Sequence, residues 1–214
     1  VIHVDLLGKK VLKEDENFVW VESNAGENWH EFVVWTIEQD FGGLENMSLI
    51  PGNVGTTPVQ NIGAYGAEIK DTFVSCDAMN IETQEMKTFT KSECNFGYRE
   101  SIFKHEAKDK FIITSVVFKL TKCNHKISVE YGDIKAELAK NNISKPTIKD
   151  VSNAVIAIRQ SKLPNPKELG NSGSFFKNPV ISREEFLKVQ EKFPDVKYFE
   201  ISETEVKVDR KSVV

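Results

Sequence analysis

The chain has 214 residues, enough for one large domain or two small ones with a buried core. Its formal net charge is −4 and its Lys and Arg residues are scattered, so no basic stripe predicts nucleic-acid binding. It contains no apolar run of about 18 residues and no visible signal peptide, which predicts a cytoplasmic protein that does not cross a membrane.

The first expected elements are two strands. Residues 1–6 and 18–22 are rich in β-branched and aromatic residues, and residues 9–17 between them are polar. This pattern predicts a β-hairpin with 9–17 as its connection.

A helix should follow this hairpin. Asn28 and Glu31 have the spacing of a capping box, and Gly42 with Gly43 should end the helix. The residues that share its apolar face are Trp29, Phe32, Val33, Thr36 and Ile37.

The middle of the chain predicts strands. Residues 72–80 and 86–90 flank a polar turn at 82–85, and residues 111–120 form the most apolar of the expected strands. We expect residues 126–130 to pair with this last strand.

Two helices are expected late in the chain. Thr147 with Asp150 opens the first, whose apolar face is Ile148, Val151, Val155 and Ile158, and Pro164 and Pro166 stop it. Ser182 with Glu185 opens the second, with Phe186, Val189 and Phe193 facing inward. The fold class is therefore α+β, with a boundary between residues 1–163 and 164–214.

Residues 51–66, PGNVGTTPVQNIGAYG, differ from the rest of the chain. The segment has four glycines and two prolines but no charged residue. Glycine permits close backbone approach, which suits a phosphate or pyrophosphate. Neither the P-loop nor the Rossmann pattern fits, and the alternative is a structural loop with tight turns.

Two later sequence motifs resemble the same family as this segment. The three motifs are called the first, second and third phrase below, in chain order. The loop itself, residues 96–104 (FGYRESIFK) and residues 170–179 (GNSGSFFKNP) together resemble the UDP-N-acetylenolpyruvoylglucosamine reductase (MurB) family. The resemblance covers about residues 1–208. It implies an FAD-binding domain of the MurB and vanillyl-alcohol-oxidase-like type in residues 1–163, followed by part of a smaller α+β substrate-binding domain in residues 164–214.

The resemblance also implies an activity. Members of the family are flavoprotein oxidoreductases that reduce UDP-N-acetylglucosamine enolpyruvate to UDP-N-acetylmuramate. This reaction belongs to bacterial peptidoglycan synthesis, and through it to cell wall biogenesis, cell shape and cell division. FAD is the implied cofactor and NADPH the implied hydride donor. The expected partners are NADPH and the enolpyruvyl sugar, with no nucleic acid and no membrane, and the full-length protein is expected to be a monomer.

Residue roles follow from the same resemblance. Arg99 is the implied active-site arginine, whose charged planar fork suits a carboxylate or enolate, and Ser174 is the implied proton donor to the substrate carbon. The implied cofactor-binding residues are Ile50, Pro51, Gly52, Gly55, Thr56, Thr57, Val59 and Gly63. The implied substrate-binding residues are Tyr65, Tyr131, Lys162, Gly173 and Asn178, with Tyr131 typical of the branch of the family that has an extra loop.

No metal site is expected. His3, His30, His105 and His125 have no mutual ligand spacing. Cys76, Cys94 and Cys123 form no CxxC pair and are expected to be reduced thiols.

The chain is expected to be a fragment. It starts inside an apolar run, residues 209–214 do not fit the preceding strand pattern and are interpreted as non-native, and no residue matches the family's catalytic glutamate. The chain alone is therefore expected to be inactive, with weakened FAD binding. Two alternatives stay open, another flavoprotein such as an oxidase of the same architecture and a non-catalytic nucleotide-sugar-binding module.

Overall fold

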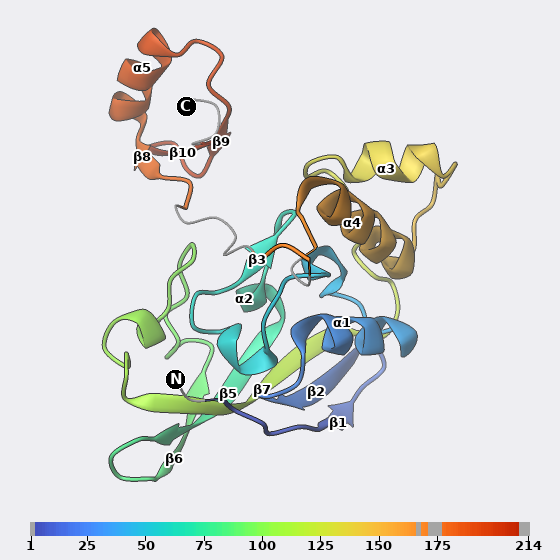
Figure 1. The fold of residues 1–214 in the computed structure, drawn as a ribbon, viewed down its shortest axis with the longest axis vertical. Helices are drawn as coiled ribbons and strands as arrows, with labels where there is room; N and C mark the ends of the chain where they lie inside the picture. Colours follow the sequence, from blue (N-terminus) through green and yellow to red (C-terminus); the bar gives the residue numbers. More distant parts are fainter. Residues whose placement is uncertain (1–2, 166–167, 171–176, 210–214) are drawn as a thin grey trace. The chain divides into compact units, whose positions relative to one another are not determined.

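The structure, a computed structural model, describes residues 3–165, 168–170 and 177–209 (Figure 1). The chain divides into two compact units, Val1–Asn165 and Pro166–Val214, which are described separately below. Strands dominate the first part of the chain, and the longest helix lies late in the first unit.

An antiparallel sheet of five strands forms the centre of the first unit. Its strand order is β1-β2-β7-β5-β6, with β7 in the middle. The strands are β1 (Lys9–Glu14), β2 (Phe18–Asn24), β5 (Phe73–Asn80), β6 (Met86–Thr90) and β7 (Phe111–Thr121). The expected strands at 72–80, 86–90 and 111–120 are therefore confirmed to within one residue at each end.

Helix α1 (Trp29–Glu38) packs its apolar side against the sheet. The ring centroids of Phe32 and Phe118 are 5.3 Å apart, and those of Trp29 and Phe118 are 6.0 Å apart. Burying an aromatic side chain of this kind stabilises a fold by about 1.5–3 kcal/mol. The predicted cap is present, because the Asn28 side chain accepts a hydrogen bond from the Glu31 N–H, but the helix ends at Glu38, before the two expected glycines.

The expected N-terminal strand is wrong. The described residues of 1–6 are not in a strand, and β1 occupies the segment expected to be a polar connection. A sheet edge explains the difference, because β1 pairs on one side only and its outward lysines stay in solvent. Lys10 adds an ion pair of 2.9 Å to Glu22 on β2.

The expected strand at 126–130 is also wrong. Strand β7 already pairs with β2 on one side and β5 on the other, so it has no edge left for a third partner. Ile127 and Val129 instead pack against a helical cluster.

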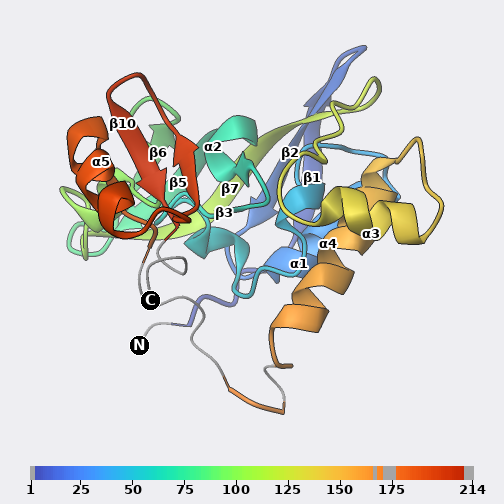
Figure 2. The same cartoon turned by 90° about the horizontal axis from the view of Figure 1, so that it is seen from above.

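That cluster is built by α3 (Ile134–Lys140) and α4 (Ile148–Lys162), which lie side by side in Figures 1 and 2. Helix α4 is confirmed with its capping box between Thr147 and Asp150. Helix α3 was not predicted. The residues buried between the two helices include Ile134, Leu138, Val151, Val155 and Ile158.

Short elements connect these parts and shape the glycine-rich segment. They are the 3₁₀ turns η1 (Glu45–Met47), η2 (Val54–Thr56) and η3 (Ile102–Lys104), the short strands β3 (Gly63–Ala64) and β4 (Ala67–Glu68), and helix α2 (Ile69–Thr72). Strand β3, at the end of the segment, and strand β4, directly after it, pair as a small antiparallel hairpin.

The second unit has its own small core. Strands β8 (Val180–Ser182), β9 (Tyr198–Glu200) and β10 (Glu205–Val208) form a sheet in the order β8-β10-β9, with helix α5 (Arg183–Lys192) beside it. Phe186 is buried there as expected. Phe193 is 45% exposed, so its predicted inward position is wrong, because the helix ends at Lys192 and the next residue leaves the helical face.

Candidate active site

The exposed part of the glycine-rich segment is its start. Pro51 and Gly52 are exposed, and Gly52 has φ of +115°, a conformation that favours glycine. A side chain at Gly52 would meet only the Thr56 hydroxyl, at 3.2 Å. The backbone at this point is therefore open to a ligand.

The next residues of the segment are fixed by the chain itself. The N–H groups of Val54 and Gly55 donate to the carbonyls of Glu27 and Ala25, at 2.9 and 3.0 Å. A side chain at Gly55 would lie 2.5 Å from the Ala25 Cβ, so glycine is needed here for close packing of two backbone segments.

The two predicted cofactor-binding threonines differ in their surroundings. Thr56 is exposed and Thr57 is buried. Each hydroxyl donates at 2.7 Å to a backbone carbonyl three residues earlier, of Asn53 and Val54 respectively. Of the two, only Thr56 is open to solvent as an acceptor for a ligand.

Val59 links the glycine-rich segment to the second phrase. Val59 and Ile50, both predicted cofactor-binding residues, pack partly buried against the main core. The buried Ser101 hydroxyl donates to the Val59 carbonyl at 2.6 Å. This hydrogen bond attaches the segment around Arg99 to the second half of the glycine-rich segment.

Arg99 stands at the tip of a tight turn. Gly97 and Glu100 exchange backbone hydrogen bonds of 3.0 and 3.2 Å, and Arg99 between them has φ of +58°. Few non-glycine residues adopt this conformation, and it is found most often where the surroundings hold it in place.

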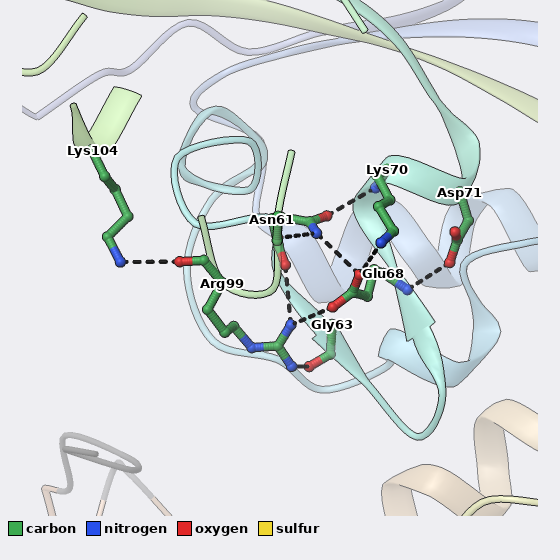
Figure 3. A network of polar contacts seen from close by, with 8 residues as sticks. Asn61, Gly63, Glu68, Lys70, Asp71, Arg99 and Lys104 are labelled. Carbon is green, nitrogen blue, oxygen red and sulfur yellow. Dashed lines mark hydrogen bonds and ion pairs between the residues drawn. The ribbon is translucent and has the colours of Figure 1, made fainter. Parts of the chain in front are cut away.

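The Arg99 guanidinium binds the glycine-rich segment directly (Figure 3). Nη1 donates to the Asn61 carbonyl at 3.1 Å and to Glu68 Oε1 at 3.3 Å, and Nη2 donates to the Gly63 carbonyl. A side chain at Gly63 would lie 2.4 Å from the Ala67 carbonyl and 3.0 Å from Arg99 Nη1. Glycine at position 63 is therefore a condition for this arrangement.

Glu68 lies at the centre of the network in Figure 3. Its Oε2 atom accepts from Asn61 Nδ2 at 3.1 Å and pairs with Lys70 Nζ at 2.9 Å, while Oε1 faces Arg99. The sequence did not single out Glu68 or Asn61. Their one signal was their position in the glycine-rich phrase and directly after it.

The predicted substrate tyrosines lie close together. A side chain at Gly66 would touch the Tyr131 ring at 3.8 Å, and one at Gly132 would touch the Tyr65 ring at 3.6 Å. Tyr65 also packs against the cluster of α3 and α4, and this burial raises the pKa of its phenol. The structure thus brings together two residues that are far apart in sequence.

Lys162 lies at the end of α4 and pairs with Asp133.

Arg159, three residues before Lys162, was not among the residues predicted from the sequence. Among the described residues its buried Nε–H has no hydrogen-bond partner, and its burial lowers the pKa of the guanidinium. Its charge acts on Tyr65, whose pKa it lowers against the effect of burial. The signal available in sequence was its i, i+3 spacing to Lys162.

Ser174 and Gly173 lie outside the described residues. Asn178 is described and belongs to the second unit, just before β8.

Within the described part of the chain, no cluster of His, Cys, Asp and Glu could hold a metal ion. Over the same residues, no helix has the length and apolar character of a membrane span.

Three kinds of comparison bear on this site. The model of a family described as an FAD binding domain matches residues 1–89. UDP-N-acetylenolpyruvoylglucosamine reductase of Flavobacterium johnsoniae is 76% identical over 208 residues, which is 97% of this chain and 62% of that protein. The proteins of the same name from Bdellovibrio bacteriovorus and Chromobacterium violaceum are 50% and 46% identical, over 86% and 97% of this chain and 54% and 61% of their own lengths.

A solved structure supports the fold. The UDP-N-acetylenolpyruvylglucosamine reductase (MurB) of Thermus caldophilus matches with a TM-score of 0.52 at 22% identity, covering 72% of this chain and 47% of that one. The α+β class with an FAD-binding architecture is therefore confirmed. The chain spans less than two thirds of the length of the relatives named above. Since its sequence follows theirs over almost all of its own residues, the chain belongs to the UDP-N-acetylenolpyruvoylglucosamine reductase family.

Proposed function

We propose that the full-length protein reduces the enolpyruvyl double bond of UDP-N-acetylglucosamine enolpyruvate, with FAD as cofactor and NADPH as reductant, in the synthesis of peptidoglycan precursors. One observation carries the proposal. The guanidinium of Arg99, from the second phrase, is held by the backbone of the first phrase at Asn61 and Gly63. A fixed cation thus lies beside the segment that resembles a flavin-binding loop.

The start of the glycine-rich segment fits FAD. The exposed backbone at Pro51 and Gly52 lets a pyrophosphate approach closely, and the Thr56 hydroxyl lies beside it. Ile50 and Val59 offer apolar surface next to this stretch. We propose that these residues, with Gly55, Thr57 and Gly63 shaping the loop, hold the cofactor, which when bound would supply hydride chemistry drawn from NADPH.

Arg99 would act on the charge that develops in the substrate. Hydride addition to an enolpyruvyl group leaves negative charge on the carboxyl oxygens, and a fixed guanidinium stabilises this charge more than that of the ground state. Its side chain is 25% exposed, so it stays open to a ligand while its position is set by the loop.

Ser174 would complete the reaction by giving its proton to the enolate carbon, for which placement matters more than acidity. We also propose Tyr65, Tyr131, Lys162, Gly173 and Asn178 as substrate-binding residues. We accordingly propose residues 1–163 as part of the FAD-binding domain and 164–214 as part of the substrate-binding domain.

The proposal includes a cytoplasmic location and a monomeric full-length protein.

The test is steady-state turnover by the purified full-length protein loaded with FAD, under anaerobic conditions. We expect NADPH consumption that depends on the enolpyruvyl sugar and yields one UDP-N-acetylmuramate for each NADPH. In a parallel aerobic assay, NADPH consumption that depends on oxygen and not on the enolpyruvyl sugar would support an oxidase. Binding of UDP-sugar without any turnover would support a non-catalytic binding module, and either result would overturn the proposal.

A further inference from the structure

We propose that Glu68 is the positioning residue of the active-site arginine. In this reading Glu68 and two backbone carbonyls hold one side of the Arg99 guanidinium, so that its other side presents two parallel N–H groups to the carboxylate of the substrate. The inference rests on the proposed function and goes beyond it, because it assigns a role to a residue outside the family phrases that identified the site.

The contacts divide the guanidinium into a held side and an open side. Nη1 uses both of its N–H groups, on the Asn61 carbonyl and on Glu68, and Nη2 uses one on the Gly63 carbonyl. Within the described part of the chain, Nε is not among the hydrogen-bond donors of Arg99. In Figure 3 the three acceptors lie on the Nη side, and the Nε side faces away from them.

The open side has the geometry that a carboxylate needs. The N–H bonds of Nε and of the neighbouring Nη2 are parallel and bind the two oxygens of one carboxylate bidentately. An enolpyruvyl group carries one such carboxylate. Rotation of the guanidinium about its stem would turn this fork away, and the held side prevents that rotation.

Glu68 is well placed to be the rigid part of the support. It is the N-cap residue of helix α2, and its backbone N–H donates to Asp71 Oδ2 at 2.9 Å. The side chain is 19% exposed and has contacts at both of its oxygens. Its rotamer is therefore fixed before any ligand binds.

The Glu68 carboxylate is shared between two cations. Glu68 carries one negative charge and faces two cations, Arg99 at 3.3 Å and Lys70 at 2.9 Å. Because Lys70 also pairs with the carboxylate, the charge of Glu68 is not directed at Arg99 alone. Glu68 can thus orient Arg99 without neutralising it, which a carboxylate paired with Arg99 alone would do.

The test measures binding, without turnover, in the full-length FAD-loaded protein. Two ligands are compared by calorimetry, UDP-N-acetylmuramate, which has a carboxylate, and UDP-N-acetylglucosamine, which lacks one. The variant Glu68→Ser keeps a good helix cap but is too short to reach Arg99. Glu68→Gln keeps an oxygen that can accept from Nη1. The matched control is Glu100→Ser, since Glu100 contacts Lys104 and His105 and not the guanidinium.

We expect Glu68→Ser to weaken binding of the carboxylate ligand about 10-fold, equal to about 1.4 kcal/mol. Binding of UDP-N-acetylglucosamine should stay unchanged, Glu68→Gln should restore most of the lost affinity, and the control should bind both ligands like the wild type. Equal weakening of both ligands by Glu68→Ser, or no weakening of either, would overturn the role of Glu68. Failure of the wild type to bind either ligand would instead contradict the proposed function.

Discussion

At the scale of single residues, Gly63 decides whether the arginine site can form. Its carbonyl accepts from Arg99 Nη2, and the space where a side chain would stand is filled by the Ala67 carbonyl at 2.4 Å. The close approach of two backbone segments is thus coupled directly to the position of the guanidinium.

We predict that Gly63→Ala lowers the free energy of unfolding by about 1–3 kcal/mol, because the added methyl group forces the β3–β4 hairpin apart. Urea denaturation of the two proteins measures this difference. Gly97→Ala is the matched control in the second phrase, since its methyl group would lie 3.4 Å from the Glu100 Cβ, at the edge of ordinary contact. Equal stabilities of Gly63→Ala and the wild type would contradict the packing described here.

His30 gives a prediction on pH. Burial lowers the pKa of its imidazole from the ordinary value of 6.5, with the charge of Arg159 acting in the same direction and that of Glu31 against it. Its Nδ1 atom accepts from the Leu49 N–H at 3.1 Å, which requires the neutral ring.

Since the unfolded chain binds this proton more readily than the folded one, stability should fall as pH drops below 6.5 toward the lowered pKa. The variant His30→Asn, which keeps an acceptor but does not titrate, should lose that part of the pH dependence. Urea denaturation at a series of pH values between about 5 and 8 tests the effect. Identical pH profiles for the variant and the wild type would exclude the contribution.

At the scale of elements, helix α4 connects the fold to the site. It packs against α3 through its buried face and ends at Lys162, with Arg159 one turn earlier. Its start is fixed by the capping box, in which Thr147 Oγ1 accepts from the Asp150 N–H at 3.3 Å and Asp150 Oδ2 accepts from the Thr147 N–H at 2.8 Å.

We predict that Thr147→Ala costs about 1 kcal/mol of stability, because an N-terminal N–H group of the helix loses its partner. Thr83→Ala, in the exposed turn between β5 and β6, is the matched control and should change stability by less than about 0.5 kcal/mol. The difference between the two variants in urea denaturation measures the cap. No difference would mean that tertiary packing alone holds this helix end.

Elements with strong local signals were predictable from sequence. Strands β5, β6 and β7 and the capped helices α4 and α5 follow from apolar patterns and cap residues that act within a few positions. The strand expected at 126–130 failed, because sequence patterns do not show that both edges of β7 are occupied. The shift of β1 into a lysine-rich segment has the same origin. Its partner strand and its position at the sheet edge depend on contacts between residues far apart in the sequence.

The site was predictable only in part, for a related reason. Arg99 and Gly63 stood out through the phrases that contain them, and the structure joins them by a hydrogen bond. Glu68 and Arg159 carry only weak local signals, the position of Glu68 directly after the glycine-rich segment and the i, i+3 spacing of Arg159 to Lys162. Their importance comes from a neighbour 31 residues away in the case of Glu68 and from burial of a guanidinium in the case of Arg159.

At the scale of the whole molecule, the proposed reaction has two steps, reduction of FAD by NADPH and reduction of the substrate. Arg99 lies in Val1–Asn165, and the predicted Ser174 and Asn178 lie in Pro166–Val214. Arg99 is the proposed charge-stabilising group, and Ser174 is the proposed proton donor. A defect in either should spare reduction of FAD by NADPH and slow the step at the substrate.

The measurement that tests this account most directly is anaerobic single-turnover kinetics of the full-length protein, followed by flavin absorbance. We predict that Arg99→Met is reduced by NADPH at the wild-type rate but is reoxidised by UDP-N-acetylglucosamine enolpyruvate at least about 10²-fold more slowly. Arg183→Met, which removes an exposed arginine paired with Glu200, is the control and should behave like the wild type in both steps. Reoxidation of Arg99→Met at the wild-type rate would contradict the assignment of the arginine site to the enolpyruvyl carboxylate.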